Sequence, residues 1–228
     1  MSYQQAKRII LPLNVISIIA SVLLLFGLLP KLTGAVCVLC VLVSWVLLFR
    51  FPDCFSLHSA KTLKSRGLEE QYCSLEWPLC ITAALSTMRI LRTHTPANWG
   101  ESLLAGVILT VVLLILALRF LSDRDMSVGE LITYVLLFGM FHIGCIWQVN
   151  LLLDVRAPEY EWVIVQTVDS SRSRKGGTTY YIKVELDGEE QRINVPFVKW
   201  AMLEGGDTVK IAIHPGGLGM EYYTLETP

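Results

Sequence analysis

Two long apolar runs in the middle of the chain constrain its fold most. The first, residues 103–118, is interrupted only by Gly106 and Thr110, and the second extends over residues 131–153. About 20 residues of α-helix cross a hydrocarbon core of about 30 Å, and a chain in lipid must satisfy its own backbone polar groups. With the polar turn at residues 122–125 between them, the two runs predict a transmembrane helical hairpin.

Two further apolar runs, residues 9–29 and 35–51, precede this hairpin. The first exceeds the apolar part of a signal peptide, and no small-residue cleavage site follows it closely, so we interpret it as an uncleaved span. Lys7 and Arg8 directly before it predict a cytoplasmic N-terminus. Residues 30–34 are expected to form a tight turn, which makes these two spans another hairpin.

The segment at residues 77–91 leaves the number of spans open. Its apolar part is short for a span, and Arg89 lies inside it. Polar side chains recur on one helical face, namely Thr82, Ser86, Arg89 and Thr93. We favour an amphipathic helix in the membrane interface or against the bundle, which gives four spans and a cytoplasmic C-terminus. The alternative is a fifth span with its polar stripe turned inward, which places the C-terminus outside.

The composition excludes several classes of protein. The chain is 53% hydrophobic and 17% charged, with a mean hydropathy of +0.52, which is unlike an ordinary soluble domain. The net charge of -1 argues against a nucleic-acid partner. Residues 154–228 carry 12 acidic and 8 basic side chains, so this tail is a separate piece that is too polar for lipid. All six cysteines precede the tail, which fits a reducing compartment.

The tail shows the short alternating pattern of β-strands. We expect strands at residues 161–168, 178–186, 191–195, 208–213 and 220–225, with a helical insert at 197–203. Asp187-Gly188 is a strong hairpin signal. Five short strands in about 70 residues predict a small SH3-like or OB-like barrel.

The predicted fold is therefore an α+β membrane protein with two domains. Residues 1–157 form a multi-pass helical bundle of four spans, or five if residues 77–91 cross, and residues 158–228 form the barrel. The spans are placed at about residues 9–29, 35–51, 102–121 and 131–153.

The order of strands and turns in the tail resembles a group of uncharacterised bacterial membrane proteins that carry such a barrel beside their spans. The resemblance covers the final third of the chain. It implies a barrel tethered to the bacterial cytoplasmic (inner) membrane, without a known catalytic centre.

Cys37-Val38-Leu39-Cys40 is the sharpest chemical motif. Positions i and i+3 of a helix share a face, so the two thiols could form a redox pair. The motif and its place at the head of the second span are similar to the disulfide bond formation protein B family of membrane thiol oxidases, which implies a quinone-linked pair. That family needs a second cysteine pair in its other outer loop and an arginine after the motif, and this chain has neither. Burial as small apolar side chains is the favoured interpretation.

Polar residues inside the spans are a second group of candidates, comprising Asn14, Arg89, His142 and Gln148. His142 and Cys145 stand at i and i+3, but zinc usually takes four ligands, so we expect no metal. Interhelical hydrogen bonding is the favoured role. An oligomeric channel lined by Asn14, Ser17, Arg89 or His142 remains an alternative.

Two features of the tail resemble elements that bind ligands in other proteins. Gly216, Gly217 and Gly219 are interpreted as turn residues, because a phosphate-binding loop would be followed by a helix. A basic loop with Arg172, Arg174 and Lys175 is interpreted as a solvated tip, and the alternative is contact with anionic lipid headgroups.

These patterns favour a non-catalytic anchor for a barrel that acts as an interaction or sensing module. The expected partners are the lipid bilayer and another protein or a second copy of the chain, and no cofactor is expected. The alternatives are a thiol-disulfide oxidoreductase that uses Cys37 and Cys40, and a small channel or membrane effector.

Overall fold

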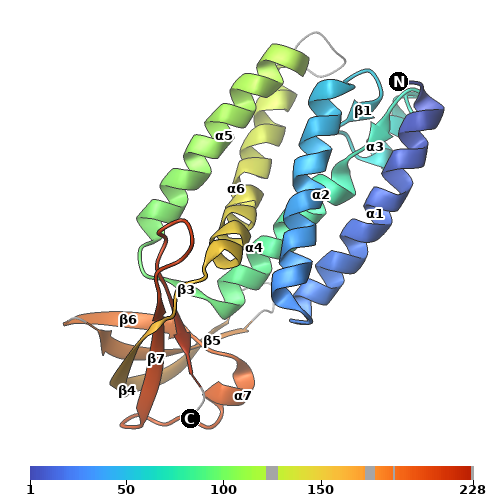
Figure 1. The fold of residues 1–228 in the computed structure, drawn as a ribbon. Coiled ribbons are helices and arrows are strands. Elements are labelled where there is room, and N and C mark those ends of the chain that lie inside the picture. The colour runs from blue at the N-terminus through green and yellow to red at the C-terminus, as the bar shows by residue number, and fades with distance from the viewer. Residues whose placement is uncertain (122–127, 173–177, 187, 227–228) are drawn as a thin grey trace. The chain divides into compact units, whose positions relative to one another are not determined.

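The computed structural model describes residues 1–121, 128–172, 178–186 and 188–226, and it is an α+β structure (Figure 1). The chain divides into two compact units. The helical unit comprises Met1–Met88 and Leu103–Val149, and the barrel unit comprises Arg89–Ser102 and Asn150–Pro228. The α+β class and the barrel-like sheet at the C-terminus confirm the coarse prediction.

Helices α1 (Tyr3–Leu25) and α2 (Pro30–Arg50) form the first hairpin. α1 begins before the apolar run, because Ser2 and Gln5 cap its first turn reciprocally. α2 begins at Pro30, where a turn was expected. Proline suits the first helical position because it has no N–H to satisfy, and Leu29, with φ of 48°, reverses the chain. Both helices are long and apolar enough to cross a membrane.

Helices α5 (Trp99–Leu121) and α6 (Val128–Leu153) correspond to the second predicted hairpin. They are antiparallel, since Gly106 approaches Ile143 and Gly139 approaches Thr110. Within their described residues the apolar stretches are Trp99–Leu113 and His142–Leu153, which are shorter than a full span. The four spans of the sequence analysis therefore stay a prediction.

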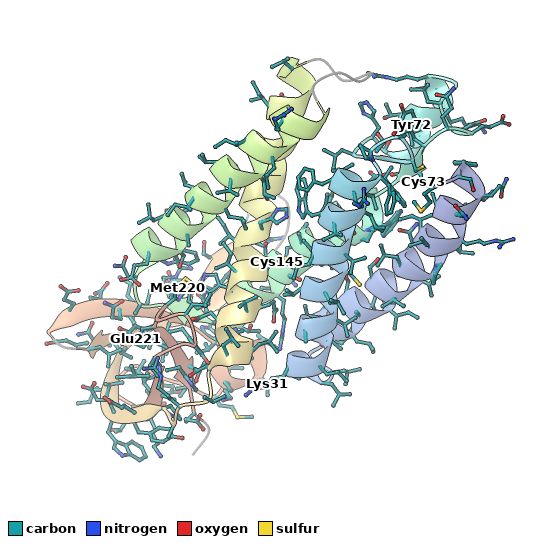
Figure 2. All side chains as sticks on the ribbon, turned by 45° about the horizontal axis from the view of Figure 1, so that its top comes forward. Lys31, Tyr72, Cys73, Cys145, Met220 and Glu221 are labelled. Atoms are coloured by element: carbon teal, nitrogen blue, oxygen red, sulfur yellow. The ribbon has the colours of Figure 1, made fainter. Side chains whose placement is uncertain are left out.

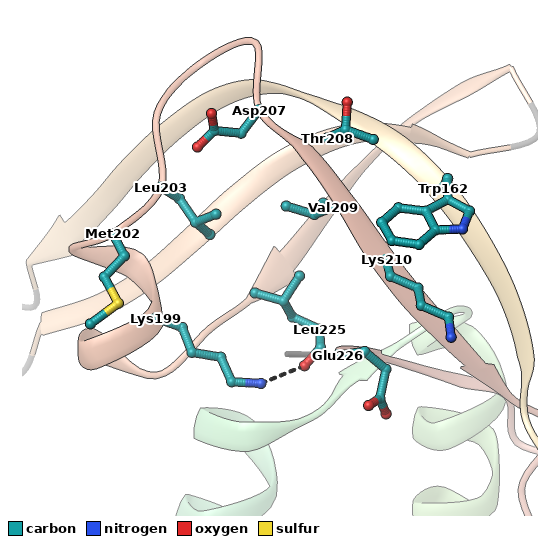
Figure 3. Close-up of a pocket in the computed structure, with 10 residues that line it drawn as sticks. All are labelled: Trp162, Lys199, Met202, Leu203, Asp207, Thr208, Val209, Lys210, Leu225 and Glu226. Carbon is teal, nitrogen blue, oxygen red and sulfur yellow. Dashed lines mark hydrogen bonds between the residues drawn. The ribbon is translucent and has the colours of Figure 1, made fainter. Parts of the chain in front are cut away.

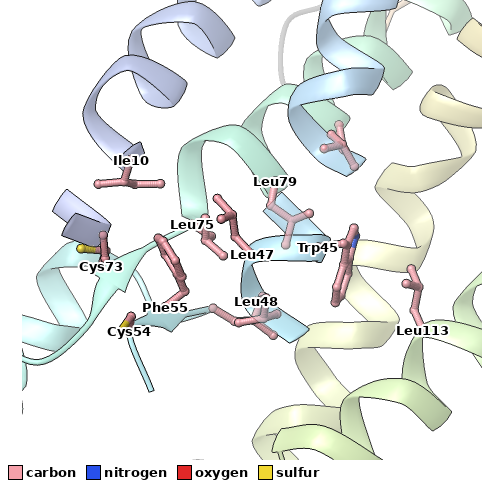
Figure 4. Close-up of a cluster of buried hydrophobic side chains, with 14 of the residues drawn as sticks. Ile10, Trp45, Leu47, Leu48, Cys54, Phe55, Cys73, Leu75, Leu79 and Leu113 are labelled. Carbon is pink, nitrogen blue, oxygen red and sulfur yellow. The ribbon is translucent and has the colours of Figure 1, made fainter. Parts of the chain in front are cut away.

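The chain between α2 and α5 packs small elements against the helices. Strands β1 (Phe55–Ser56) and β2 (Cys73–Ser74) pair in parallel, and α3 (Ala60–Ser65) lies between them in sequence. A π-helical turn, η1 (Glu76–Ile81), leads into α4 (Thr82–Thr93). Figure 4 shows the buried cluster that holds this region, in which Trp45, Phe55, Leu75 and Leu79 come together.

The first two residues of the polar face of α4 are buried, whereas Arg89 and Thr93 are half-buried. Thr82 and Ser86 are 1% and 0% exposed. Ser21 Oγ donates to Thr82 Oγ1 at 3.4 Å, and Gly144 N donates to Thr87 Oγ1 at 3.1 Å. A side chain at position 144 would overlap the Thr87 backbone, so glycine permits this close approach. This end of the polar stripe therefore faces other helices, as both a helix packed against the bundle and an inward-facing span would.

The barrel-like sheet has six antiparallel strands in the order β3-β8-β7-β4-β5-β6. The long strand β4 (Glu159–Arg172) pairs with β7 (Thr208–His214) through residues 159–164 and with β5 (Thr178–Leu186) through residues 165–172. β6 (Glu189–Asn194) and β8 (Tyr222–Leu225) complete the predicted strands, with α7 (Phe197–Trp200) as the helical insert. Alternate residues fill the core, as predicted: Ile182, Val184, Leu186, Val209 and Ile211 are buried.

One strand of the barrel comes from between two helices. β3 (Thr95–Pro96) pairs with β8, and Asn194 N of β6 donates to Thr95 Oγ1 at 2.8 Å, so the sheet nearly closes. Two residues carry no periodicity, and the sequence therefore gave no sign of this strand. The barrel unit consequently includes Arg89–Ser102 and residues 150–157 besides the predicted domain at 158–228.

Asn150 joins the end of α6 to the barrel. Its side chain is fully buried, with Nδ2 donating to Met220 O at 2.8 Å and Oδ1 accepting from Leu218 N at 2.8 Å. Gly217 N donates to Asn150 O at 2.9 Å and so caps the helix. The glycine-rich loop, residues 216–219, therefore packs against the last turn of α6. Its Gly216 needs glycine, because φ is +65° there.

We predict that Gly217→Ala destabilises the barrel unit. The added methyl group would overlap Leu153 and lie 2.7 Å from Asp154 N, and such overpacking costs about 1–3 kcal/mol. Thermal unfolding of the purified protein in detergent, followed by circular dichroism, should show a Tm lower by several degrees. Gly129→Ala is the matched control, since a methyl group there meets nothing within 4 Å. Equal Tm values for the two variants would contradict the prediction.

Candidate functional site

A pocket of about 340 Å³ in the barrel unit is the candidate binding site (Figure 3). It lies beside α7, the turn that follows α7, and the strands β4, β7 and β8. Ten residues line it: Trp162, Lys199, Met202, Leu203, Asp207, Thr208, Val209, Lys210, Leu225 and Glu226.

An aromatic cluster positions the helical wall of the pocket. Tyr180 of β5 contacts the rings of Phe197 and Trp200, with centroids 5.0 and 4.8 Å apart. Trp200 Nε1 also donates to Asp169 O at 2.9 Å. Two backbone hydrogen bonds hold the turn after α7 to Val165 of β4. Gly206 N donates to Val165 O, and Val165 N donates to Asp207 O, both at 2.8 Å. These bonds hold both sides of the pocket.

The pocket combines an apolar floor with two exposed walls. Figure 3 shows Leu203, Val209 and Leu225 in the middle, with Met202 on one side and Trp162 on the other. Met202 is 77% exposed and Trp162 is 64% exposed. Large apolar side chains that gather around a hollow on a surface mark sites of interaction.

The charged side chains of the pocket balance one another. Lys199 Nζ donates to Leu225 O at 2.7 Å, and Lys210 Nζ lies 3.8 Å from the centre of the Tyr160 ring. Asp207 Oδ2 accepts a bond from Glu204 N at 2.8 Å. Glu226 is the fourth charged group. With two ammonium and two carboxylate groups, the rim favours neither a strongly anionic nor a strongly cationic ligand.

A second polar cluster surrounds Tyr222 in the barrel unit. Tyr222 Oη donates to Asp154 Oδ2 at 3.0 Å, and its ring stacks on His214 with centroids 4.5 Å apart. Burial, and then the bond to Asp154, raise the pKa of Tyr222. His94 meets the same ring edge-on at 5.3 Å, and burial lowers the pKa of His94 to about 4, with Arg89 and His214 adding to the effect.

This cluster does not form a catalytic triad. His214 Nε2 and Thr224 Oγ1 are 3.0 Å apart, but His214 Nδ1 is 3.8 Å from Asp154 Oδ2, which is beyond a hydrogen bond. Among the described residues, no group of three or more His, Cys, Asp or Glu side chains could hold a metal ion. The arrangement serves packing between the segments of the barrel unit.

Five of the six cysteines are buried, and Cys80 is half-buried. Cys37 and Cys40 are 0% and 3% exposed, and Cys37 Sγ lies 3.9 Å from Ser21 Oγ. Figure 2 shows Cys73 and Cys145 in different parts of the helical unit. All six thiols are free. The geometry brings no second thiol pair to Cys37 and Cys40 from an exposed loop, so the redox alternative gains no support from the described residues.

The intramembrane polar candidates lie apart from one another. Trp45 Nε1 donates to His142 Nε2 at 2.7 Å, which is the favoured interhelical hydrogen bonding. Gln148 packs against Gly34, where a side chain would collide with its amide. Asn14 Oδ1 is buried without a hydrogen-bond partner among the described residues, and Arg89 is half-buried in the barrel unit. These residues do not converge on one site.

The basic loop of the tail is described only at its start. Arg172 is exposed at the end of β4, whereas Arg174 and Lys175 lie outside the described residues. The sequence analysis missed Trp162, Met202 and Asn150. Trp162 had a signal, since Tyr160, Trp162 and Ile164 alternate on one face of β4 and are all exposed. Comparison with known protein families, curated proteins and solved structures finds no match to this chain.

We predict that protonation of His94 destabilises the barrel unit in acid. Its folded pKa of about 4 lies below the unfolded value of 6.5, so the unfolded chain binds the extra proton. Stability is complete above pH 6.5 and declines as the pH falls toward 4, by about 3 kcal/mol in total. Denaturant unfolding between pH 4 and 7, followed by tryptophan fluorescence, measures this slope. His94→Phe should flatten it, and an unchanged slope would contradict the assignment.

Proposed function

We propose that the protein is an integral membrane protein that carries the barrel unit as a non-catalytic interaction module. α1, α2, α5 and α6 are among the helices that cross the bilayer, and the N-terminus lies in the cytoplasm. The pocket binds an extended peptide segment of another protein through one large apolar side chain. The observation that carries this proposal is the pocket itself, with the exposed walls Trp162 and Met202 above an apolar floor.

The surface of the helical unit supports the membrane location. Large apolar side chains point outward along the helices, and polar side chains lie inside, which is the reverse of a soluble protein. The exposed apolar residues of α1 and α5 include Leu11, Val15, Ile19, Leu104, Val107, Ile108 and Ile115. The buried polar residues include Ser17, Ser21, Ser44, Thr82, Ser86, His142 and Gln148. In a membrane, lipid chains would surround these exposed apolar side chains.

The size and charge of the pocket support a peptide ligand. A volume of about 340 Å³ is at the lower end of the range for ligand sites, and it suits one large side chain. Tryptophan is enriched among the residues that dominate protein interfaces, and methionine adapts to different partners. The balanced rim suits a peptide backbone better than a phosphate polymer.

We predict that the full chain stays in the membrane fraction after extraction with alkaline carbonate. Peripheral proteins are released by this treatment, whereas spans buried in hydrocarbon are held by their apolar surface. Immunoblotting of supernatant and pellet measures the distribution, with detergent extraction as the control for solubility. Recovery of the protein in the carbonate supernatant would refute the membrane assignment.

We predict that the pocket selects peptides with a large apolar residue. A displayed random-peptide library is panned on the purified full chain, and enriched peptides are titrated by fluorescence anisotropy. Removing both walls with Trp162→Ala and Met202→Ala should weaken binding at least tenfold, because these two side chains form the large apolar walls of the pocket. Leu218→Ala is the control, since Leu218 is exposed but does not line the pocket. Enrichment that is equal on the double variant, or no enrichment, would refute the proposed role.

A further inference from the structure

We infer that the barrel unit lies on the opposite side of the membrane from the N-terminus, in the extracytoplasmic space. The inference rests on the proposed membrane location, and it names the compartment from which the partner comes. It differs from the cytoplasmic placement that four spans imply. Contacts within the helical unit give the direction of each helix, and the length of the connections then gives the side of the barrel.

The N-terminal end of α1 lies beside the connection that follows α2. Tyr3 Oη donates to Glu69 O at 2.7 Å, and Cys54 Sγ donates to Met1 O at 3.1 Å. The other end of α1 lies beside the beginning of α2, since Leu24 and Cys37 share one buried cluster. The helical unit therefore has a near side, defined by Tyr3 and residues 51–75, and a far side, defined by residues 26–29.

α4 runs from the near side toward the far side. Just before η1, Leu75 packs in one cluster with Ile10. Further on, Thr82 bonds to Ser21, which lies about 27 Å along α1 from Tyr3 at 1.5 Å per residue. Glu76 to Thr93 is about 27 Å of helix by the same measure, close to the thickness of a hydrocarbon core. Burial of Thr82 and Ser86 removes the objection that this segment is too polar to cross.

The contacts of α6 show that this helix also ends on the far side, without any use of the contacts of α4. His142 bonds to Trp45 in the second half of α2, and the later Gln148 packs against Gly34 near its beginning. α6 is therefore antiparallel to α2 and ends on the side where α2 begins. That side is the far side.

The connections to the barrel are too short to return through the membrane. α4 ends at Thr93 and β3 begins at Thr95, while α6 ends at Leu153 and β4 begins at Glu159. Six extended residues span at most about 21 Å, which is less than the ~30 Å of hydrocarbon. Both parts of the barrel unit therefore emerge on the far side.

The distribution of basic residues identifies the near side as the cytoplasm. Among the described residues, seven lysines and arginines flank the helices on the near side, and four do so on the far side. An excess of these residues marks cytoplasmic connections. The near-side residues are Lys7, Arg8, Arg50, Lys61, Lys64, Arg66 and Arg119, and the far-side residues are Lys31, Arg89, Arg92 and Arg156. The pocket consequently faces extracytoplasmic partners, and α4 is a fifth crossing.

Single cysteines test this topology in intact cells with a membrane-impermeant maleimide. Ser171→Cys reports on the barrel unit, Lys31→Cys on the far side of the helical unit and Glu70→Cys on its near side, and all three positions are exposed. The unchanged chain measures the background from its six native thiols, which are buried or half-buried. We expect at least tenfold more labelling above this background at Ser171→Cys and Lys31→Cys than at Glu70→Cys. Glu70→Cys should react only after permeabilisation.

The other outcomes separate the inference from the proposed function. If Ser171→Cys reacts together with Glu70→Cys and apart from Lys31→Cys, the inference is overturned while the membrane location stands. If Ser171→Cys and Lys31→Cys both need permeabilisation and Glu70→Cys does not, the assignment of the compartment is overturned. If all three react only after permeabilisation and the protein is carbonate-soluble, the proposed function fails first.

Discussion

The structure depends on one constraint: polar groups that leave water must find partners inside the protein. Trp45 meets this constraint through His142, Ser21 through Thr82, and Asn150 through the backbone of the glycine-rich loop. An unsatisfied buried polar group costs about 1–3 kcal/mol, so each of these contacts fixes which helix faces which neighbour. The outward apolar surface of the helical unit follows from the same requirement, because the polar side chains occupy the inside.

The barrel unit is built from two separate stretches of the chain, Arg89–Ser102 and Asn150–Pro228. It includes the end of α4, the start of α5 and the last turn of α6, together with the strand β3 between two of them. Asn150 and the loop that caps it hold α6 to the sheet.

Much of this fold could be predicted from periodicity. The alternation at Ile182, Val184 and Leu186 gave the core face of the barrel, and the apolar runs gave the helices. The two-residue strand β3 has no period to detect, and Pro30 suits a turn and a first helical position equally well. The polar stripe of α4 left two arrangements open, because amphipathicity shows that a helix has two faces, but not whether its polar face meets water or other helices. The pocket depends on side chains brought together by the fold from β4, α7 and β8, which no local pattern reveals.

The position of β3 in the chain sets the order in which the protein can be completed. Thr95 pairs with Tyr223. During synthesis at about 5–20 residues per second, β3 waits roughly 6 to 25 s for its partner strand. Throughout that interval the ribosome is still producing two apolar helices and most of the sheet. The open edge of the nascent barrel is therefore exposed until β8 has been synthesised, and a chain interrupted before β8 would keep that edge permanently available for aberrant pairing.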